Sequence, residues 1–244
     1  HADEKGNLLR EVLEQVEHID LAYFAGGEPT LTEEHYIMLE EMIRKGRTDI
    51  ILRYNTNASN IKFKDYDLLD MWKHFKKIEL SCSGERAESL RHGTDWGLVE
   101  SNLLKFRELD YVSFQMNTVF SIFNYSTIGE FYQYLKDKNI IRAEDWYHSL
   151  YLAVHPSYYS AKSLPKELKV EAATKALDWA EKNTGDHTSL SRLVTDAVNF
   201  AKDDDTWTEN KETFMLHTGS GDRIRNESFW KTFPELNKLM DLTE

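Results

Sequence analysis

Short apolar segments alternate with amphipathic segments along residues 19–154, and this alternation limits the fold more than any other feature. Each short segment is rich in β-branched and aromatic residues, as buried strands are. Each is followed, within a few residues or a longer loop, by apolar residues at helical spacing. Because strands that alternate with helices form parallel sheets, the pattern predicts an α/β fold. The predicted strands are 19–25, 49–55, 77–81, 111–122 and 149–154.

The helices are predicted from the same periodicity and from their stop signals. Gly46 follows the second helix where a glycine commonly ends one, and Thr94 or Asp95 caps the helix that starts there. After Pro165 the pattern contains helices only. The predicted helices are 8–16, 32–45, 66–75, 94–106, 128–135, 168–180, 190–201 and a set around Trp207 to Leu239.

The charge and hydropathy of the sequence indicate which kinds of partner the protein binds. The net charge of -12 and the pI near 5.3 argue against a broad nucleic-acid surface and favour small molecules or proteins. No apolar run approaches ~20 residues, and residues 1–5 lack the features of a signal peptide. We therefore expect no membrane partner and a cytoplasmic location.

Cys82 is the single cysteine of the sequence. This excludes an internal disulfide and any metal centre built from several thiolates of these 244 residues. Strand alternation points Cys82 away from the face shared by Ser81 and Ser83, so we expect a small buried hydrophobe.

Candidate ligand-binding residues follow the predicted strands, because chemistry in parallel α/β barrels lies at the carboxyl ends of the strands. The turn after the first strand holds two adjacent glycines, which let a ligand approach the backbone closely. The sequence has no recognisable nucleophile–base pair, so a hydrolase is disfavoured. Asp203–Asp205 is interpreted as a solvated loop, and the glycines at 219 and 221 follow no strand and are not interpreted as a phosphate loop. The candidate segments are Gly26–Pro29, Asn55–Asn57, Ser81–Gly84, residues 115–124 and His155.

Several of these segments resemble the motifs of radical S-adenosylmethionine (SAM) enzymes, in the order in which that family has them. Gly-Gly-Glu-Pro at 26–29 is similar to the motif after the family's second strand. Tyr54–Ala58, Glu79–Gly84 and Arg91–Trp96 are similar to segments on and after its third and fourth strands. The tail resembles members with a twitch-type C-terminus, on the segments 155–159, 164–165, 222–223 and 233–236.

The resemblance implies a partial (β/α) barrel, a radical SAM core without its first strand, with a C-terminal helical region. The implied domains are residues 1–160 for the barrel and 161–244 for the twitch-like helical part. The implied cofactor is SAM, with Arg91 a candidate for its carboxylate and the fourth-strand serines for its ribose. The implied SAM-binding residues are Gly26, Gly27, Glu28, Pro29, Asn55, Asn57, Ser81, Ser83, Arg91, Thr118 and Asn124.

Two departures from the family bear on function. Ser83 stands where an aspartate is common, which keeps a hydrogen-bonding group for the ribose. The Cys-x3-Cys-x2-Cys loop that binds the 4Fe-4S cluster is absent, together with the first strand. The sequence is interpreted as a fragment whose upstream part carries that loop, and the alternative is a lineage that lost the cluster.

In the intact family the cluster and SAM generate a 5′-deoxyadenosyl radical that abstracts hydrogen from a substrate. The resemblance thus predicts a radical SAM enzyme whose substrate is unspecified; peptides or proteins are suggested by family analogy. The alternatives are a SAM-binding or scaffold protein without a cluster, and an unrelated barrel enzyme with Glu28 and His155 as acid and base. An uncovered edge at the strand 19–25 also predicts self-association.

Overall fold

The computed structural model describes residues 9–84, 94–145, 147–185 and 188–241, and within them the chain is an α/β protein. Five strands form a parallel sheet in the order β1-β2-β5-β6-β7. These strands are β1 (Leu21–Phe24), β2 (Ile51–Thr56), β5 (Ile78–Ser83), β6 (Val112–Phe120) and β7 (Ser149–Leu152). Every predicted strand is therefore present, and most are shorter than predicted.

The chain divides into two compact units, and the division falls inside β6. Unit 1 comprises residues 1–84 and 94–116, and unit 2 comprises residues 85–93 and 117–244. The helices after residue 160 belong to unit 2 together with β7 and the last part of β6. The domain boundary predicted at residue 160 was placed where the sequence changes from alternating strands and helices to helices alone, and it stays a prediction.

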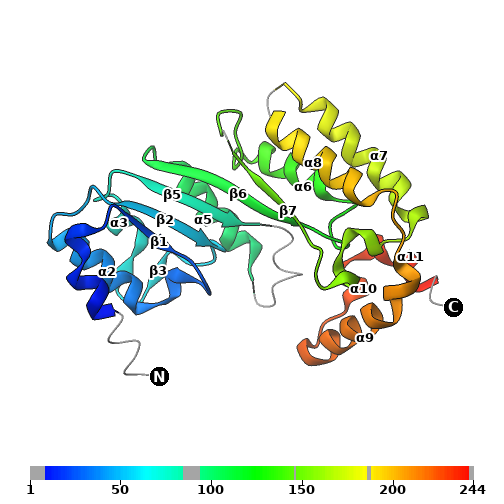
Figure 1. The fold of residues 1–244 in the computed structure, drawn as a ribbon, viewed down its shortest axis with the longest axis horizontal. Helices are drawn as coiled ribbons and strands as arrows, with labels where there is room; N and C mark the ends of the chain where they lie inside the picture. The colour runs from blue at the N-terminus through cyan, green and yellow to red at the C-terminus, as the bar shows by residue number, and fades with distance from the viewer. Residues whose placement is uncertain (1–8, 85–93, 146, 186–187, 242–244) are drawn as a thin grey trace. The chain divides into compact units, whose positions relative to one another are not determined.

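Unit 1 is a sheet with helices packed on one face (Figure 1). Alternate residues of β2 are buried, and Tyr54 lies 5.4 Å from His35 of α2 and 5.0 Å from Trp72 of α3, between ring centroids. Trp72 in turn lies 5.4 Å from Phe106 of α5. The opposite face of the strand carries Arg53 and Asn55, which are exposed. The helices are α2 (Glu33–Arg44), α3 (Leu68–Trp72) and α5 (Trp96–Arg107).

Helix ends in unit 1 agree with the sequence signals in two cases and differ in one. The Asp95 side chain accepts a hydrogen bond from Leu98 N at the start of α5, and Gly46 has a φ of +71° just after α2. The helix predicted over 66–75 was wrong in its extent, because a hairpin of β3 (Lys62–Phe63) and β4 (Tyr66–Asp67) precedes a helix of five residues. Asp67 ends this hairpin and caps α3 through Leu69 N and Asp70 N.

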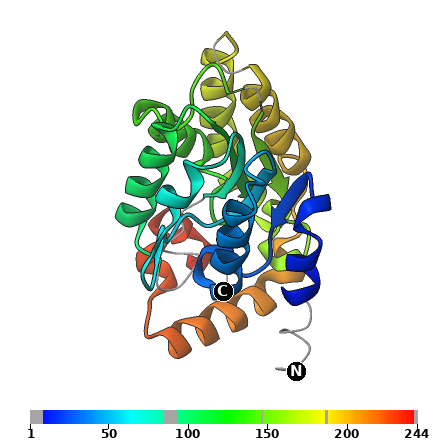
Figure 2. The same ribbon diagram turned by 90° about the vertical axis from the view of Figure 1, so that its left-hand side faces the viewer.

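Unit 2 contains a helical layer beside the ends of β6 and β7. α7 and α8 run side by side, as both Figure 1 and Figure 2 show. α6 approaches α7 closely at Gly129, where an added Cβ would lie 3.0 Å from Cβ of Trp179, which is tighter than an ordinary van der Waals contact. The helices are α6 (Ile128–Asp137), α7 (Lys166–Lys182), α8 (Thr188–Ala201), α9 (Trp207–Arg225), α10 (Phe229–Thr232) and α11 (Lys238–Asp241).

A buried lysine stabilises the helical layer of unit 2. Lys169 of α7 is 1% exposed, and its Nζ donates to the backbone oxygens of Lys162, Ala201 and Asp204 at 3.0, 2.9 and 2.6 Å. Burial lowers the pKa of Lys169 to about 8, so the side chain is charged at neutral pH. The charge lies at the carboxyl end of α8, where the helix dipole favours a cation.

The predicted roles of two further segments can be compared with the structure. Asp203–Asp205 lies between α8 and α9, and Asp205 accepts hydrogen bonds from Lys166 N and Trp207 N. The glycines at 219 and 221 are within α9 and form no loop. Asp203–Asp205 is thus a loop between helices, as predicted, and the two glycines are not part of a phosphate-binding loop. None of the described helices is long and apolar enough to cross a membrane.

Candidate functional site

The turn after β1 is the centre of the predicted SAM site. Gly26 and Gly27 have φ values of +87° and +54°, which L side chains rarely adopt. Both glycines are exposed, and no heavy atom of the described residues is recorded within 4 Å of the position that a Cβ would take. The turn thus leaves open space beside its backbone, and this is a feature that a ligand contacting the two glycines requires.

Glu28 ties this turn to the end of β2. Its Oε1 accepts from Thr30 N, Thr30 Oγ1 and Thr56 Oγ1 at 3.3, 2.7 and 2.7 Å, and Oε2 accepts from Asn57 N at 2.8 Å. Pro29 is buried at the start of the short helix that follows. The carboxylate is therefore occupied by protein donors and holds the glycine turn in place.

Polar side chains from the next two strands lie on the exposed face of the sheet. Asn55 pairs in register with Ser81, and both lie on the same face because paired residues of neighbouring strands do so. Asn55 Nδ2 donates to Tyr23 Oη at 2.6 Å, and Ser81 Oγ donates to Gln115 Oε1 at 3.5 Å. Ser83 lies two residues after Ser81 and is half-buried. The structure thus brings the predicted β1, β2 and β5 residues to one edge of unit 1.

Asn57 and its neighbour shape the loop after β2. Asn57 Oδ1 accepts from Ser59 N at 2.8 Å, while Ala58 has a φ of +57° and its carbonyl accepts from Asn102 Nδ2 at 2.9 Å. Asn102 comes from α5 and is buried. The side-chain oxygen of Asn57 therefore stabilises the loop directly.

Three charged residues form two ion pairs on the same exposed sheet face. Arg53 donates to Glu79 at 2.6 Å, and Lys77 contacts the other carboxylate oxygen at 2.7 Å. Lys77, followed by Arg53, holds the pKa of Glu79 below its usual range. Because Glu79 is partly exposed, these ion pairs add little to stability, and their effect is to keep this face polar with mixed charge.

Two of the remaining predicted SAM-binding residues belong to unit 2, where the structure shows their own contacts. Thr118 and Asn124 belong to unit 2 and are both buried. Asn124 Oδ1 accepts from Ser121 N at 2.9 Å and its Nδ2 donates to Val119 O at 2.7 Å, so it closes the end of β6. Thr118 Oγ1 has no hydrogen-bond partner among the described residues. Arg91 lies outside the described residues.

Cys82 is fully buried on the helix-covered face of β5, as the alternation of the strand predicts. Burial, and then the negative charge of Glu28, raises the pKa of its thiol far above the usual range. Within the described part of the chain, no group of three or more His, Cys, Asp or Glu side chains is placed to hold a metal ion. One buried thiol does not fit a cluster that needs three thiolates.

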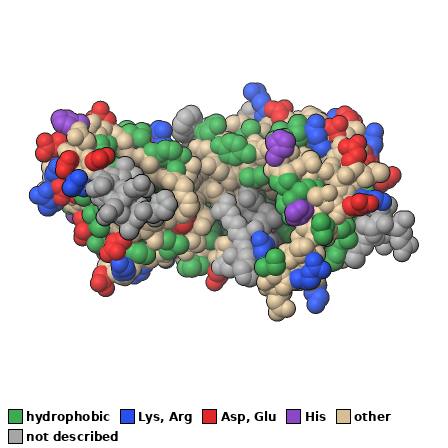
Figure 3. Space-filling model, turned by 60° about the horizontal axis from the view of Figure 1, so that its bottom comes forward, with side chains coloured by type: hydrophobic (Ala, Val, Ile, Leu, Met, Phe, Trp, Pro, Cys, Tyr) green, Lys and Arg blue, Asp and Glu red, His purple; other side chains and the backbone are tan. Residues whose placement is uncertain are grey.

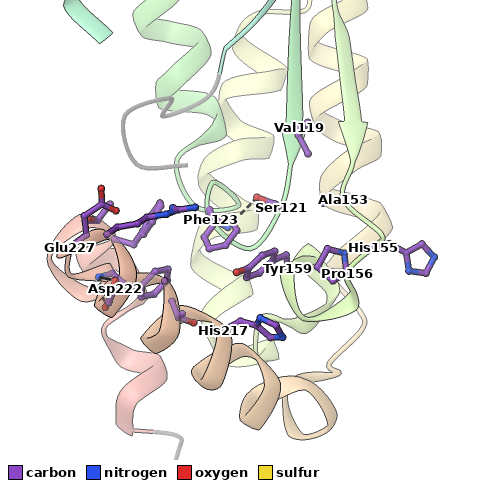
Figure 4. Close-up of a pocket in the computed structure, with 16 residues that line it drawn as sticks. Val119, Ser121, Phe123, Ala153, His155, Pro156, Tyr159, His217, Asp222 and Glu227 are labelled. Carbon is purple, nitrogen blue, oxygen red and sulfur yellow. Dashed lines mark hydrogen bonds between the residues drawn. The ribbon is translucent and has the colours of Figure 1, made fainter. Parts of the chain in front are cut away.

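Unit 2 contains a pocket that is lined in part by two of the predicted candidate segments, residues 115–124 and His155, and in part by α9 and α10, which were not predicted to form a site (Figure 4). It has a volume of ≈ 410 Å³, within the usual range for small-molecule sites. Three separate segments form it: the end of β6, the chain after β7, and α9 with α10. The sixteen lining residues are Val119, Ser121, Phe123, Ala153, His155, Pro156, Tyr159, His217, Thr218, Gly221, Asp222, Arg225, Glu227, Phe229, Thr232 and Phe233.

Aromatic rings form the apolar part of this pocket. The ring centroid of Phe123 lies 4.8 Å from Tyr159, 5.3 Å from Phe233 and 6.0 Å from Phe229. Phe229 and Phe233 are buried, so the rings are held by the core of the unit. The many aromatic residues near the C-terminus indicate a hydrophobic core in this region. The sequence does not show that a pocket remains beside that core.

The pocket is also lined by charged residues of both signs. Arg225 is exposed in the last turn of α9, and Glu227 is exposed two residues later. Asp222 accepts from Phe229 N through both carboxylate oxygens, at 2.8 and 3.0 Å. His155 also lines the pocket, with its ring pointing away from the other labelled side chains (Figure 4).

The comparisons with known proteins give no relationship. No protein-family model matches the chain, and no curated protein or solved structure matches it. On the face shown in Figure 3, acidic and basic side chains are interspersed within each unit. The class of protein that the structure defines is thus an α/β protein with a five-stranded parallel sheet, an exposed polar edge in unit 1 and a pocket in unit 2.

Proposed function

We propose that this chain is the SAM-binding barrel of a radical SAM enzyme. One observation carries the proposal. Three sequence segments that resemble family motifs lie at the carboxyl ends of the adjacent parallel strands β1, β2 and β5, around two glycines with open space beside them among the described residues. This function requires that the parallel sheet be part of a (β/α) barrel, and we include that partial barrel in the proposal.

Residues of unit 1 would have distinct tasks in holding SAM. The backbone at Gly26 and Gly27 would contact its methionyl end, while the side chains of Asn55, Ser81 and Ser83 would offer hydrogen bonds to the nucleoside. Glu28 is a positioning residue, since its carboxylate is already occupied by Thr30, Thr56 and Asn57. In the family, bound SAM supplies the 5′-deoxyadenosyl group for hydrogen abstraction from a substrate.

Weak binding of SAM is expected from these residues alone, since the family's cluster provides direct ligation to the cofactor. Saturation-transfer NMR with SAM should give a signal in the unchanged chain and none in Gly27→Asn. Asparagine tolerates a positive φ, so this variant adds a side chain with little backbone strain. A chain that gives no more signal than Gly27→Asn, or calorimetry with submicromolar affinity, would contradict the proposal.

Gly46→Asn is the matched control for this experiment. Gly46 has a φ of +71°, and as at Gly27 no heavy atom within residues that the structure describes lies within 4 Å of an added Cβ; it lies at the other end of α2. Equal loss of signal in both variants would attribute the effect to folding rather than to the turn.

Cluster ligands would have to lie outside these 244 residues, because the sequence contains Cys82 alone and that thiol is buried. Reconstitution of the chain with iron and sulfide should therefore give no stoichiometric cluster and no reductive cleavage of SAM. About four irons per chain, bound by these residues, would overturn this part of the proposal.

The buried single cysteine also favours a second function, a SAM-binding or scaffold protein that performs no radical chemistry. The coding sequence before His1 separates the two. Three cysteines at the family's spacing there would support the enzyme, and a reading frame without them would support the scaffold.

Peptide or protein substrates remain a proposal by family analogy. A further proposed partner is a strand from a second copy or another segment, because β1 is an end strand of the sheet that the described residues form, and its Leu21 and Tyr23 are 39% and 54% exposed. Light scattering at high protein concentration tests this, and a monodisperse monomer would count against it.

A further inference from the structure

The pocket of unit 2 combines a group of aromatic rings with separate charges of opposite sign, and its described lining residues all belong to unit 2. We propose that this pocket binds a free α-amino acid with an aromatic side chain. The proposal does not depend on SAM binding by unit 1, and it assigns a second ligand to the protein.

The aromatic part of the ligand is inferred from the rings around Phe123. Phe123 is half-buried, with Tyr159 and Phe233 at centroid distances of 4.8 and 5.3 Å and interplanar angles of 58° and 37°. Tilted rings at these separations accept a further ring in an offset or edge contact. A volume of ≈ 410 Å³ accommodates one or two rings with a short polar group.

The carboxylate of the ligand is inferred from three hydrogen-bond donors among the lining residues. The guanidinium of Arg225 makes no hydrogen bond or ion pair with a carboxylate among the described residues, and it is close enough to Tyr159 to act electrostatically on that phenol. Burial raises the pKa of Tyr159, so its hydroxyl keeps its proton at neutral pH. Ser121 Oγ accepts from Phe123 N, which leaves its own hydrogen for a ligand.

The ammonium group is inferred from Asp222, which lines the pocket on α9 three residues before Arg225. Side chains three residues apart on a helix are neighbours, so one small ligand can reach both charges. An anion alone would leave the carboxylate without a counter-charge, and a cation alone would leave the guanidinium without one. Asp222 accepts only from Phe229 N in the described structure, so its carboxylate retains lone pairs for an ammonium. A zwitterion satisfies both signs at once.

The experiment is calorimetric titration with L-phenylalanine and three analogues that each lack one feature. These are 3-phenylpropionate without the ammonium, phenethylamine without the carboxylate, and L-alanine without the ring. L-phenylalanine should bind at least tenfold more tightly than each of them. Equal affinity for either singly charged analogue, or for L-alanine, would overturn the proposal, as would no binding of L-phenylalanine.

Gly221→Leu tests the location of the ligand without removing any side chain. Gly221 lines the pocket on α9, no heavy atom of the described part of the chain lies within 4 Å of an added Cβ, and leucine is a better helix former than glycine. This variant should fold and lose L-phenylalanine binding by at least tenfold. Gly219→Leu is the control, since Gly219 lies on the same helix with equal space and does not line the pocket, and it should bind as the unchanged chain does.

Charge recognition has its own matched pair. Arg225→Gln should weaken L-phenylalanine about tenfold and leave weak phenethylamine binding unchanged, while Arg223→Gln should change neither. Arg223 is exposed on α9, contacts Ser220 Oγ and does not line the pocket. Equal losses in both variants would contradict a carboxylate contact at Arg225.

Saturating SAM added to the L-phenylalanine titration separates this proposal from the proposed function. Unchanged affinity supports two sites. Displacement in proportion to SAM would show that the pocket belongs to the SAM site and would overturn the second ligand. Failure of Gly27→Asn to affect SAM would contradict the proposed function alone.

Discussion

Units 1 and 2 both present the carboxyl ends of parallel strands, yet they form different kinds of site. In unit 1 the polar groups that follow β1 and β2 bond mainly to one another, with Glu28 at the centre and two exposed glycines beside it. In unit 2 the chain after β6 and β7 continues into aromatic residues and α9, and a pocket with charges of both signs results. The comparison shows that the end of a parallel strand does not by itself make a binding site. The residues that follow the strand decide whether its polar groups bond to one another or line a pocket.

The largest expected effect is at the centre of the unit 1 network. Glu28→Ala removes the acceptor of four hydrogen bonds and leaves part-buried donors of Thr56 and Asn57 unpaired. We expect a loss of about 3 to 4 kcal/mol in the free energy of unfolding, measured in urea. Hydrogen exchange should show the loss in unit 1 and not in α7 or α8.

Glu34→Ala is the control for this change. Glu34 is exposed in the first turn of α2, and its removal should cost at most about 0.5 kcal/mol through the helix dipole. Similar losses in the two variants would mean that Glu28 acts as an ordinary surface charge and would remove the contrast between the units.

Acid should destabilise unit 1 through His35. Burial lowers the pKa of His35 from 6.5 to about 4 in the folded protein. The unfolded chain therefore binds more protons between these values, and the free energy of unfolding should fall by about 3 kcal/mol as the pH falls from 6.5 to 4. The full contribution of neutral His35 is present above pH 6.5.

His35→Phe tests this dependence on pH. Tyr54 Oη accepts from Trp72 Nε1 at 3.1 Å and lies 2.8 Å from His35 Nε2, so phenylalanine loses one hydrogen bond and keeps a ring among Phe24 and Tyr36. The variant should be less stable at pH 7 and lose most of the pH dependence between 6.5 and 4. An unchanged slope would assign the acid sensitivity to other groups.

Lys169 provides the corresponding test in unit 2. Lys169→Met removes three hydrogen bonds to backbone oxygens and should cost about 2 kcal/mol, with faster hydrogen exchange at the end of α8. Lys166→Met, on the exposed first turn of α7, should change stability by less than about 0.5 kcal/mol. Faster exchange in unit 1 rather than in α8 would show that Lys169 does not act locally.

The smallest expected effect has opposite signs in the two units. Ala58 has a φ of +57° after β2, so Ala58→Gly should stabilise the protein by about 1 kcal/mol. Ala172 is in α7 and buried, so Ala172→Gly should destabilise it by about 1 kcal/mol. Thermal unfolding measures both, and destabilisation by Ala58→Gly would show that its methyl group contributes more than the backbone conformation costs.

The sequence by itself determined the local elements of this protein. The period of the apolar residues located all five strands of the parallel sheet, and alternation placed Cys82 on the buried face. Asp95 and Gly46 marked helix ends that the structure contains. These features depend on windows of a few residues, in which side-chain direction and backbone preference act directly.

Tertiary structure alone decided what the polar residues do. Glu28 looked like part of a ligand-binding turn, and its bonds to Thr56 and Asn57 depend on the pairing of β1 with β2. Asn124 was likewise predicted to bind a ligand, and in the structure its amide group bonds to Ser121 N and Val119 O at the end of β6. A hydrogen-bonding group binds whichever partner the fold brings near, and that partner can be distant in the sequence.

The pocket of unit 2 is the clearest case of this limit. Its lining comes from residues 119–123, 153–159 and 217–233, and each segment alone reads as a strand end, a turn or a helix. The two glycines inside α9 are poor helix formers, and packing of Phe214 and Trp207 holds the helix against that preference. Concavity arises only when separate segments pack and leave space between them, so no single stretch of sequence encodes it.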